Sequence, residues 1–178
     1  MKLLIASDIH GSAQYCQKLI TAIEKEAPSK VLLLGDLLYH GPRNDLPAGY
    51  APKEVAAMLN GIKEKLICVR GNCDSEVDQM MLEFPILSDS AMLFCDSLTI
   101  YACHGHHEFP ALMPGDVVVS GHTHVPADDE KEGIRSLNPG SVSIPKENSW
   151  HGYIVLEDST FTWKNLDGEI QKIEIKKQ

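Results

Sequence analysis

The sequence lacks an apolar run long enough to cross a membrane, and it lacks a recognisable secretory signal. A membrane helix needs about 20 consecutive apolar residues, and no stretch of the 178 residues comes near this. The apolar start MKLLIASD meets an acid at Asp8, too early for a signal-peptide core. Hydrophobic residues make up an ordinary 43%. We therefore expect a cytoplasmic protein with no membrane contact, folded as one domain over residues 1–178.

The cysteines indicate neither a disulfide framework nor a thiolate metal site. Their number, 5, is odd, they are scattered, and none forms a C-x-x-C pair. Reduced thiols are therefore expected. Four of them lie in apolar segments and are expected in the core: Cys16, Cys68, Cys95 and Cys103. Cys73, in RGNCD, leaves three roles open: nucleophile, metal ligand or replacement for another side chain.

Positive charge and aromatic residues are both scarce. The net charge is −9, and aromatic residues make up 6% of the chain. A groove for nucleic acid needs clustered cations and stacking aromatics, so no nucleic-acid footprint is expected. The charge also disfavours anionic substrates unless cations are bound locally.

Hydrophobic patterning predicts an α/β protein. The first half alternates strand and helix, which is typical of parallel strands joined by crossover helices. Ser12 is the expected N-cap of a helix over about 13–27, and Pro52 opens a second helix after a loop, 39–52, with three prolines and two glycines. The expected strands are 2–7, 30–34, 66–69, 91–95, 98–103, 116–120, 134–138, 153–157, 161–166 and 169–175. We expect a sandwich of two mixed sheets flanked by helices.

Five expected strands end in side chains that can bind metal. These side chains are Asp8, His10, Asp36, Asn72, His104, His122 and His124. Each alone is compatible with a turn or a surface residue. Their joint occurrence by chance is improbable. In α/β sheets, ligands bind at the carboxyl ends of the strands, which is where these residues are expected. Seven oxygen and imidazole ligands are more than one tetrahedral ion needs, and this number suits two divalent ions bridged by a carboxylate.

The motif order D-x-H, G-D, G-N, H and G-H-x-H resembles the calcineurin-like metallophosphoesterase superfamily. The segments GDLLYHGPRNDLPAGYAP, RGNCDSEVDQM, HGH and NPGSVSIPK are similar to its bacterial YfcE-type phosphodiesterases. The resemblance implies a four-layer α/β/β/α fold. It also implies two metal sites, bridged by Asp36. The expected ligands of the first are Asp8, His10 and His124, and those of the second are Asn72, His104 and His122. Mn²⁺ is the first expectation; Zn²⁺, Fe²⁺, Ni²⁺ and Mg²⁺ are the other candidate ions.

The implied reaction is hydrolysis of a small phosphodiester (EC 3.1.4) by a hydroxide held between the ions, with weak or no monoesterase activity. Asn72, Cys73 and His104 are the expected catalytic residues. Most of the superfamily has histidine where this chain has Cys73, so this thiol either replaces the usual acid or only fills space beside Asn72. Arg43 is expected to bind the phosphate together with Cys73, whereas His40, in the same loop, is assigned to solvent.

Two other functions remain open: a non-catalytic metal-binding scaffold for protein interactions, and a nuclease on polymeric nucleic acid. The filled ligand set argues against the first, and the charge against the second. MMLEFPIL and EFPALMP are candidate apolar surfaces for a homodimer or higher homo-oligomer, and a buried role is equally compatible. His106 is expected beside the metal ligands. Asn138 and Ser141 are assigned to a tight turn in preference to a role at the site.

Overall fold

Short apolar runs form a six-stranded first sheet. The computed structural model describes residues 1–95 and 97–174. The first sheet has the order β11-β10-β9-β1-β2-β3. Its strands are β1 (Leu3–Ala6), β2 (Lys30–Leu33), β3 (Leu66–Cys68), β9 (Gly152–Glu157), β10 (Thr160–Asn165) and β11 (Ile170–Glu174). β1, β2 and β3 run parallel, whereas β9 pairs antiparallel to β1 and continues as an antiparallel meander.

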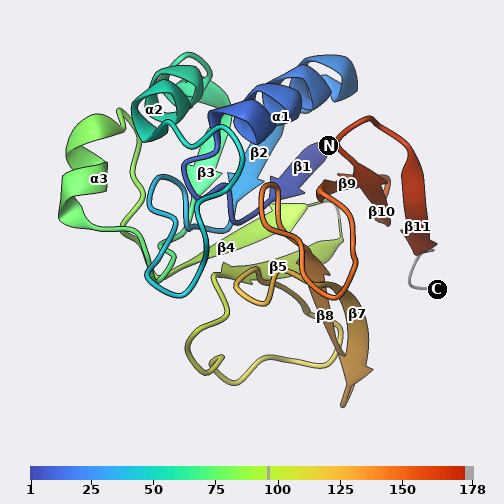
Figure 1. The fold of residues 1–178 in the computed structure, drawn as a ribbon. Coiled ribbons are helices and arrows are strands. Elements are labelled where there is room, and N and C mark those ends of the chain that lie inside the picture. Colours follow the sequence, from blue (N-terminus) through green and yellow to red (C-terminus); the bar gives the residue numbers. More distant parts are fainter. Residues whose placement is uncertain (96, 175–178) are drawn as a thin grey trace.

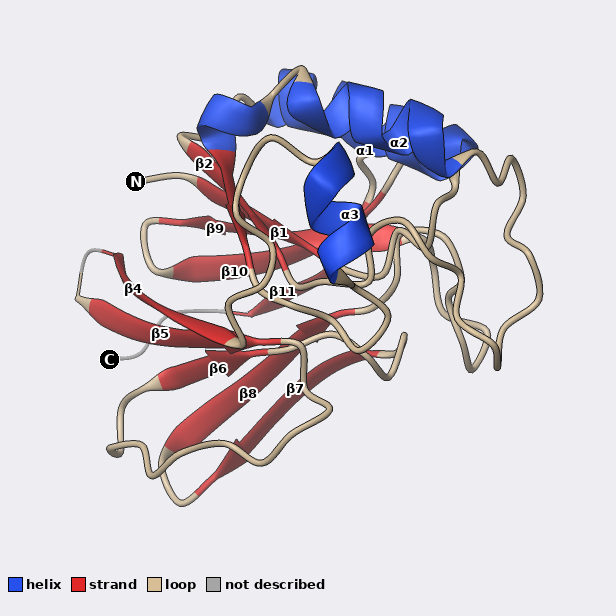
Figure 2. Ribbon diagram, turned by 90° about the vertical axis from the view of Figure 1, so that its left-hand side faces the viewer, coloured by secondary structure: helices blue, strands red, loops and turns tan. Residues whose placement is uncertain are grey.

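A five-stranded second sheet packs against the first (Figure 2). Its order is β4-β5-β6-β8-β7. Its strands are β4 (Ser90–Cys95), β5 (Leu98–Cys103), β6 (Val117–Val119), β7 (Pro126–Lys131) and β8 (Ile134–Pro139). β5, β6 and β8 are parallel, and the two edge strands are antiparallel to their neighbours. The expectation of two mixed sheets packed face to face is confirmed.

Helices cover the outer face of the first sheet (Figure 1). α1 (Ala13–Glu26) begins at Ser12, whose side chain accepts the Tyr15 N–H, and α2 (Pro52–Asn60) has proline at its first position. α3 (Glu76–Met81) carries a capping box between Ser75 and Asp78. Figure 2 shows no helix over the outer face of the second sheet among the described residues. None of these helices is both long and apolar enough to span a membrane.

The core has two layers because successive side chains of a strand point to opposite faces. Leu4 faces α1 and α2 in one cluster, while Leu3 and Ile5 face the second sheet in the other. Trp163 is fully buried between the sheets, and its Nε1 donates to the Asn138 carbonyl at 2.8 Å. Burial on both faces explains why β1 and β2 are continuous apolar runs.

The buried segments largely match the sequence interpretation. The thiols expected in the core lie there. Of the two candidate surfaces, MMLEFPIL buries Leu82 and Ile86 and leaves Met80 exposed, whereas EFPALMP leaves Met113 exposed. The expected last strand, 169–175, is observed as β11; residue 175 lies outside the described residues.

Candidate metal centre

The carboxyl ends of the parallel strands of both sheets meet in one region. The segment after β1 is bonded to the segment after β2: Asp8 N–H donates to the Gly35 carbonyl at 3.1 Å. The segments after β5 and β6 are joined by the bond from Gly121 N–H to the His104 carbonyl at 2.9 Å. The two sheets are joined where His122 N–H donates to Asp8 Oδ2 at 3.0 Å. These backbone contacts bring the side chains at the strand ends together.

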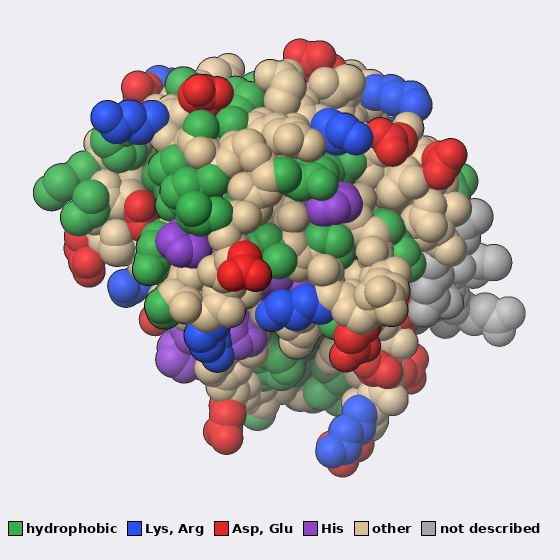
Figure 3. Space-filling view, viewed as in Figure 1, with side chains coloured by type: hydrophobic (Ala, Val, Ile, Leu, Met, Phe, Trp, Pro, Cys, Tyr) green, Lys and Arg blue, Asp and Glu red, His purple; other side chains and the backbone are tan. Residues whose placement is uncertain are grey.

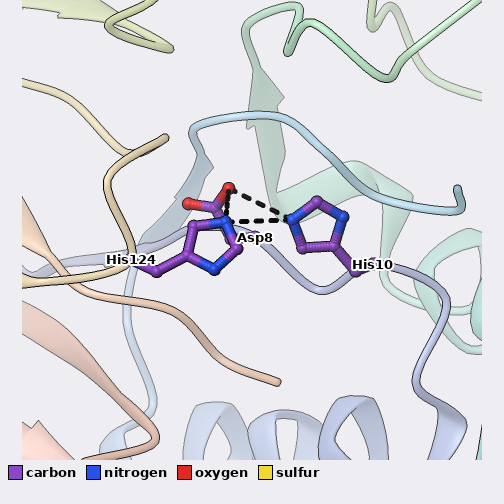
Figure 4. Close-up of side chains that lie close together, drawn as sticks. All are labelled: Asp8, His10 and His124. Carbon is purple, nitrogen blue, oxygen red and sulfur yellow. Dashed lines mark hydrogen bonds and ion pairs between the residues drawn. The ribbon is translucent and has the colours of Figure 1, made fainter. Parts of the chain in front are cut away.

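Asp8, His10 and His124 form a first cluster (Figure 4). Asp8 Oδ1 lies 3.2 Å from His124 Nε2 and 3.5 Å from His10 Nε2, and the two Nε2 atoms are 3.2 Å apart. All three residues are at most 3% exposed. One carboxylate oxygen and two imidazole nitrogens therefore face a common point, as metal ligands do.

Asp36 lies between this cluster and His104. Its Oδ2 is 3.7 Å from His10 Nε2 and 3.5 Å from His104 Nε2, the position that a bridging carboxylate needs. Asn72 Oδ1 and His122 Nδ1 approach His104 Nε2 at 3.0 and 3.2 Å. The seven residues expected as ligands thus lie together, and Asp8, Asp36 and His104 form a second group with ligand atoms within 4.8 Å.

Backbone carbonyls orient three of the imidazoles. The Nδ1 atoms of His10, His104 and His124 contact the carbonyls of Tyr39, Leu34 and Ile144 at 2.9, 2.6 and 2.7 Å. A carbonyl only accepts, so each Nδ1 must carry a hydrogen, and each neutral ring presents an Nε2 lone pair to the site. Asp8 Oδ1 is buried without a hydrogen-bond donor. Acceptors facing one another repel unless a cation lies among them, so the residues fit divalent metal ions.

The backbone is strained at these ligands. Five candidate ligands have φ between 48° and 67°: Asp8, His10, Asp36, His122 and His124. Non-glycine residues rarely adopt this left-handed region, and each instance costs roughly 1–3 kcal/mol. Such strain gathers at functional sites because the surrounding contacts hold it in place.

Hydrogen bonds from residues outside the ligand set hold the site. The Ser141 and Ser143 hydroxyls donate to the Asp8 carbonyl at 2.8 and 3.1 Å. Asn138 Nδ2 donates to the Gly121 carbonyl at 2.7 Å and to Thr123 Oγ1 at 3.1 Å. Asn138 and Ser141, for which the sequence favours a tight turn, thus also fix segments that carry candidate ligands.

Asp74 joins the ends of β2 and β3. Its carboxylate accepts the N–H groups of Asp36, Leu37 and Gly71 at 2.8, 2.9 and 2.8 Å. Glycine at position 71 lets the segment after β3 lie close to Asp36, since a Cβ there would lie 2.1 Å from Asp36 Oδ1. Sequence interpretation missed Asp74, although an acid following G-N-x was the signal available.

The buried carboxylates and imidazoles of the centre shift one another's pKa values. Burial lowers the pKa of His104, but the carboxylates of Asp36 and Asp8 outweigh burial and raise it to about 9. Burial raises the pKa of Asp36, and His104 reverses this, so that the net pKa lies below the usual value. The site without metal therefore takes up positive charge as protons, which metal ions would displace.

Cys73 lies at the edge of the centre. Its Sγ groups with ligand atoms of His10 and Asp36 within 4.8 Å and accepts from Asn72 Nδ2 at 3.3 Å. Burial, followed by the charge of Asp36, raises the pKa of this thiol to about 12. A protonated thiol is a poor nucleophile, so of the three open roles the nucleophile is disfavoured.

A cavity of about 370 Å³ opens onto the centre. Asp36, Asn72, Cys73, His122 and His124 line it. So do Gly41, Pro42, Arg43, Asn44, Thr123 and Lys146. The structure thus places Arg43 in the lining of the cavity and adds Lys146, the last residue of NPGSVSIPK, to which sequence interpretation gave no role.

The other two loop histidines with expected positions, His106 and His40, lie in different surroundings. His106 packs edge-on to His104, a candidate ligand, with ring centroids 5.3 Å apart. His40 packs edge-on between Tyr39 and Tyr50 and does not line the cavity. It is half-buried, so its assignment to solvent holds only in part.

Comparison with known proteins finds close relatives over most of the chain. The sequence model of the calcineurin-like phosphoesterase superfamily domain matches residues 1–160. Phosphodiesterase YfcE of Escherichia coli K12 is 44% identical over 166 residues, which cover 91% of this chain and 90% of the relative. The solved structure of YfcE, a phosphoesterase from E. coli, superposes with a TM-score of 0.94 at 42% identity and covers 98% of both chains. Zinc-bound Vps29 of Entamoeba histolytica, 21% identical, covers 98% of this chain and 97% of that chain and shares the fold with a TM-score of 0.63.

Proposed function

The chain belongs to the calcineurin-like phosphoesterase superfamily, and we propose that it hydrolyses phosphodiester bonds of small molecules with the help of two divalent metal ions. One observation carries the proposal: three imidazoles whose Nδ1 atoms are held by backbone carbonyls direct Nε2 toward the carboxylates of Asp8 and Asp36. The relative named a phosphodiesterase supports the reaction class.

Seven residues would hold the metals. The first ion would take Asp8, His10 and His124, the second Asn72, His104 and His122, and Asp36 would bridge them. Mn²⁺ is proposed first, because the donor set mixes carboxylate and amide oxygen with imidazole and is not the thiolate set that copper or zinc clusters prefer. Bound ions would lower the pKa of a water molecule and offset charge on the phosphoryl oxygens.

Residues of the chain bind and orient the substrate. Arg43 lines the cavity and forms no hydrogen bond or ion pair with another described residue, so its guanidinium is free to bind phosphoryl oxygens in bidentate fashion. Asn72 also lines the cavity, and its Nδ2, which donates to Cys73 Sγ, can donate to the same phosphoryl group. Asp8 and His124 are buried, which excludes bulk water from one side of the phosphorus.

A thiol at position 73 favours hydrolysis of diesters that have a good leaving group. A diester carries one charge and needs less neutralisation than a monoester dianion. A thiol is shorter than imidazole and a weaker donor, so the leaving group gets little help with its proton. We propose that Cys73 takes the place of the usual acid and that the enzyme acts weakly or not at all on monoesters. A cytoplasmic location remains part of the proposal.

The first test is hydrolysis of bis-p-nitrophenyl phosphate and p-nitrophenyl phosphate by metal-stripped protein before and after Mn²⁺ is restored. Metal-dependent cleavage of the diester is expected in the wild type and lost in Asp36→Ala. Asp129→Ala, an exposed acid on edge strand β7, is the matched control and should behave as wild type. Stoichiometric metal binding without turnover by any divalent ion would favour the scaffold function.

A further inference from the structure

Two cations from different loops line the cavity beside the candidate ligands. Arg43 comes from the loop after β2, and Lys146 from the loop after β8. Figure 3 shows Lys and Arg side chains beside His side chains on this face of the molecule. Arg43 suffices for the single charge of a reacting phosphodiester, so a second cation needs a different partner.

Lys146 has no ion-pair partner within the described part of the chain. Other lysines do pair: Lys2 and Lys164 with Glu26, and Lys18 with Asp167. Lys146 thus keeps an unpaired ammonium group at the cavity, although the chain has 25 acids and a net charge of −9. Its ammonium is available to an anion from solution.

The loop that carries Lys146 is tied to a candidate metal ligand. Lys146 N–H donates to the His124 carbonyl at 3.2 Å, while His124 Nδ1 bonds the Ile144 carbonyl at 2.7 Å. The Ser149 hydroxyl and N–H both bond the Lys146 carbonyl, at 2.6 and 3.0 Å. The next two residues, Glu147 and Asn148, have left-handed φ values of 55° and 57°. This strained turn fixes the backbone of Lys146 against the metal centre.

The cleft extends in two directions from the centre. A second cavity, about 640 Å³, shares Pro42, Arg43, Asn72 and Cys73 with the first. It leads instead to Tyr39, Arg70, Val77 and neighbouring residues. The two ester groups of a phosphodiester diverge from phosphorus, so one arm can enter each cavity, and only the arm in the first meets Lys146.

We propose that Lys146 forms a subsite for a second anionic group, a carboxylate or phosphate, on one ester arm of the substrate. The inference rests on the proposed function, since it adds a substrate class to the same cleft. It predicts a substrate that is asymmetric, with one charged arm beside His124 and Lys146 and the other beside Tyr39 and Val77.

Three p-nitrophenyl phosphodiesters test the subsite in the Mn²⁺-loaded protein: the butyl, 3-carboxypropyl and 3-phosphonopropyl esters. The wild type should favour at least one charged ester over butyl in kcat/KM, mainly through KM. That preference should fall roughly 5- to 10-fold in Lys146→Ala, because the variant loses one charge-assisted hydrogen bond to the substrate. The preference should survive in Lys146→Arg. Lys65→Ala, an exposed lysine at the opposite end of β3, should keep the preference.

Lysine acetylation mapped by mass spectrometry gives a readout independent of turnover. 4-Phosphonobutyrate has no ester to cleave and should protect Lys146 more than butylphosphonate does, whereas neither should protect Lys65. Equal turnover of all three esters, a preference unchanged in Lys146→Ala, or absent protection of Lys146 would overturn the subsite. Failure of the wild type to cleave any of the esters would count against the proposed function instead.

Discussion

At the scale of single residues, Asn138 shows how a side chain outside the ligand set holds the centre. It is 4% exposed, its Nδ2 bonds the Gly121 carbonyl and Thr123, and its Oδ1 accepts the Gly140 N–H at 2.8 Å. The amide is needed because it donates and accepts at once. The segment it fixes carries both His122 and His124.

Asn138→Asp keeps the shape and removes the donor. A carboxylate oxygen would then face the Gly121 carbonyl in a buried site, and the free energy of unfolding should fall by about 2 kcal/mol or more. Urea unfolding measures this, and metal titration should show weaker binding. Asn148→Asp, at an exposed turn, should change neither. Wild-type stability in Asn138→Asp would show that these bonds contribute little.

Cys73→His tests the thiol in the same cleft. An imidazole reaches further and donates a proton more readily than a thiol of raised pKa. Hydrolysis of phenyl phosphate, whose phenolate is a poorer leaving group than p-nitrophenolate and needs a proton, should therefore increase, by about tenfold or more if protonation of the leaving group limits turnover. Cys103→His is no useful control because Cys103 is buried, so Cys73→Ala serves instead. An equal gain in Cys73→Ala would mean that the thiol only fills space.

At the scale of elements, Glu26 fastens the C-terminal end of α1 to the first sheet. It is 9% exposed and bonds Lys164 of β10 at 2.6 Å, Tyr153 of β9 at 3.2 Å and Lys2 at 3.0 Å. Burial raises the pKa of this carboxyl, but Lys164 and Lys2 outweigh burial, and the net pKa lies below its ordinary 4.5.

Glu26→Gln should lower the free energy of unfolding at neutral pH by about 2 kcal/mol, because the partly buried ammonium of Lys164 loses its counter-charge and that of Lys2 keeps only Glu157. Since the pKa is lower in the folded chain, the contribution is fully present above 4.5 and is lost as the pH falls through the folded-state pKa. The difference between variant and wild type should therefore shrink in acid. Glu24→Gln, exposed on the same helix, should show no difference at either pH.

Elements with a strong local pattern were predictable from sequence. The Ser12 cap and Pro52 mark helix starts correctly, and apolar runs mark β1, β2 and β5. β7 was missed because its sequence, PADDEK, is polar at an exposed edge and has no buried alternation. α3 was missed although its capping box, Ser75 to Asp78, could have revealed it. The insertion of β9 beside β1 depends on pairing across most of the chain, which no local pattern encodes.

The sequence pointed to the candidate ligands, which the structure brings together, but not to the residues that support them. The ligands follow apolar strands, so their positions are written in the local sequence. Ser141 and Asn138 act through contacts with segments 133 and 17 positions away, and Lys146 contributes through the shape of a cavity. Such roles depend on three-dimensional proximity alone.

At the scale of the whole molecule, the candidate metal centre joins the two sheets. Asp8 and His10 follow β1 of the first sheet, whereas His104 and His124 follow β5 and β6 of the second. Two buried carboxylates, Asp8 and Asp36, add to a chain of net charge −9. Divalent ions would offset this charge and cross-link the sandwich, so metal binding is expected to stabilise the entire fold.

Adding Mn²⁺ to metal-stripped protein should therefore raise the thermal midpoint. When the free Mn²⁺ concentration is about 100 times the dissociation constant, binding at one site raises the free energy of unfolding by roughly 2.7 kcal/mol. For a chain of this size, this raises the thermal midpoint by about 5–10 °C. Differential scanning calorimetry measures the shift. His124→Ala should lose most of it, while His107→Ala, which removes an exposed imidazole, should keep it. Ca²⁺, which prefers oxygen ligands, should shift the midpoint less than Mn²⁺ does. An equal shift in His124→Ala would place the stabilising ion outside the proposed centre.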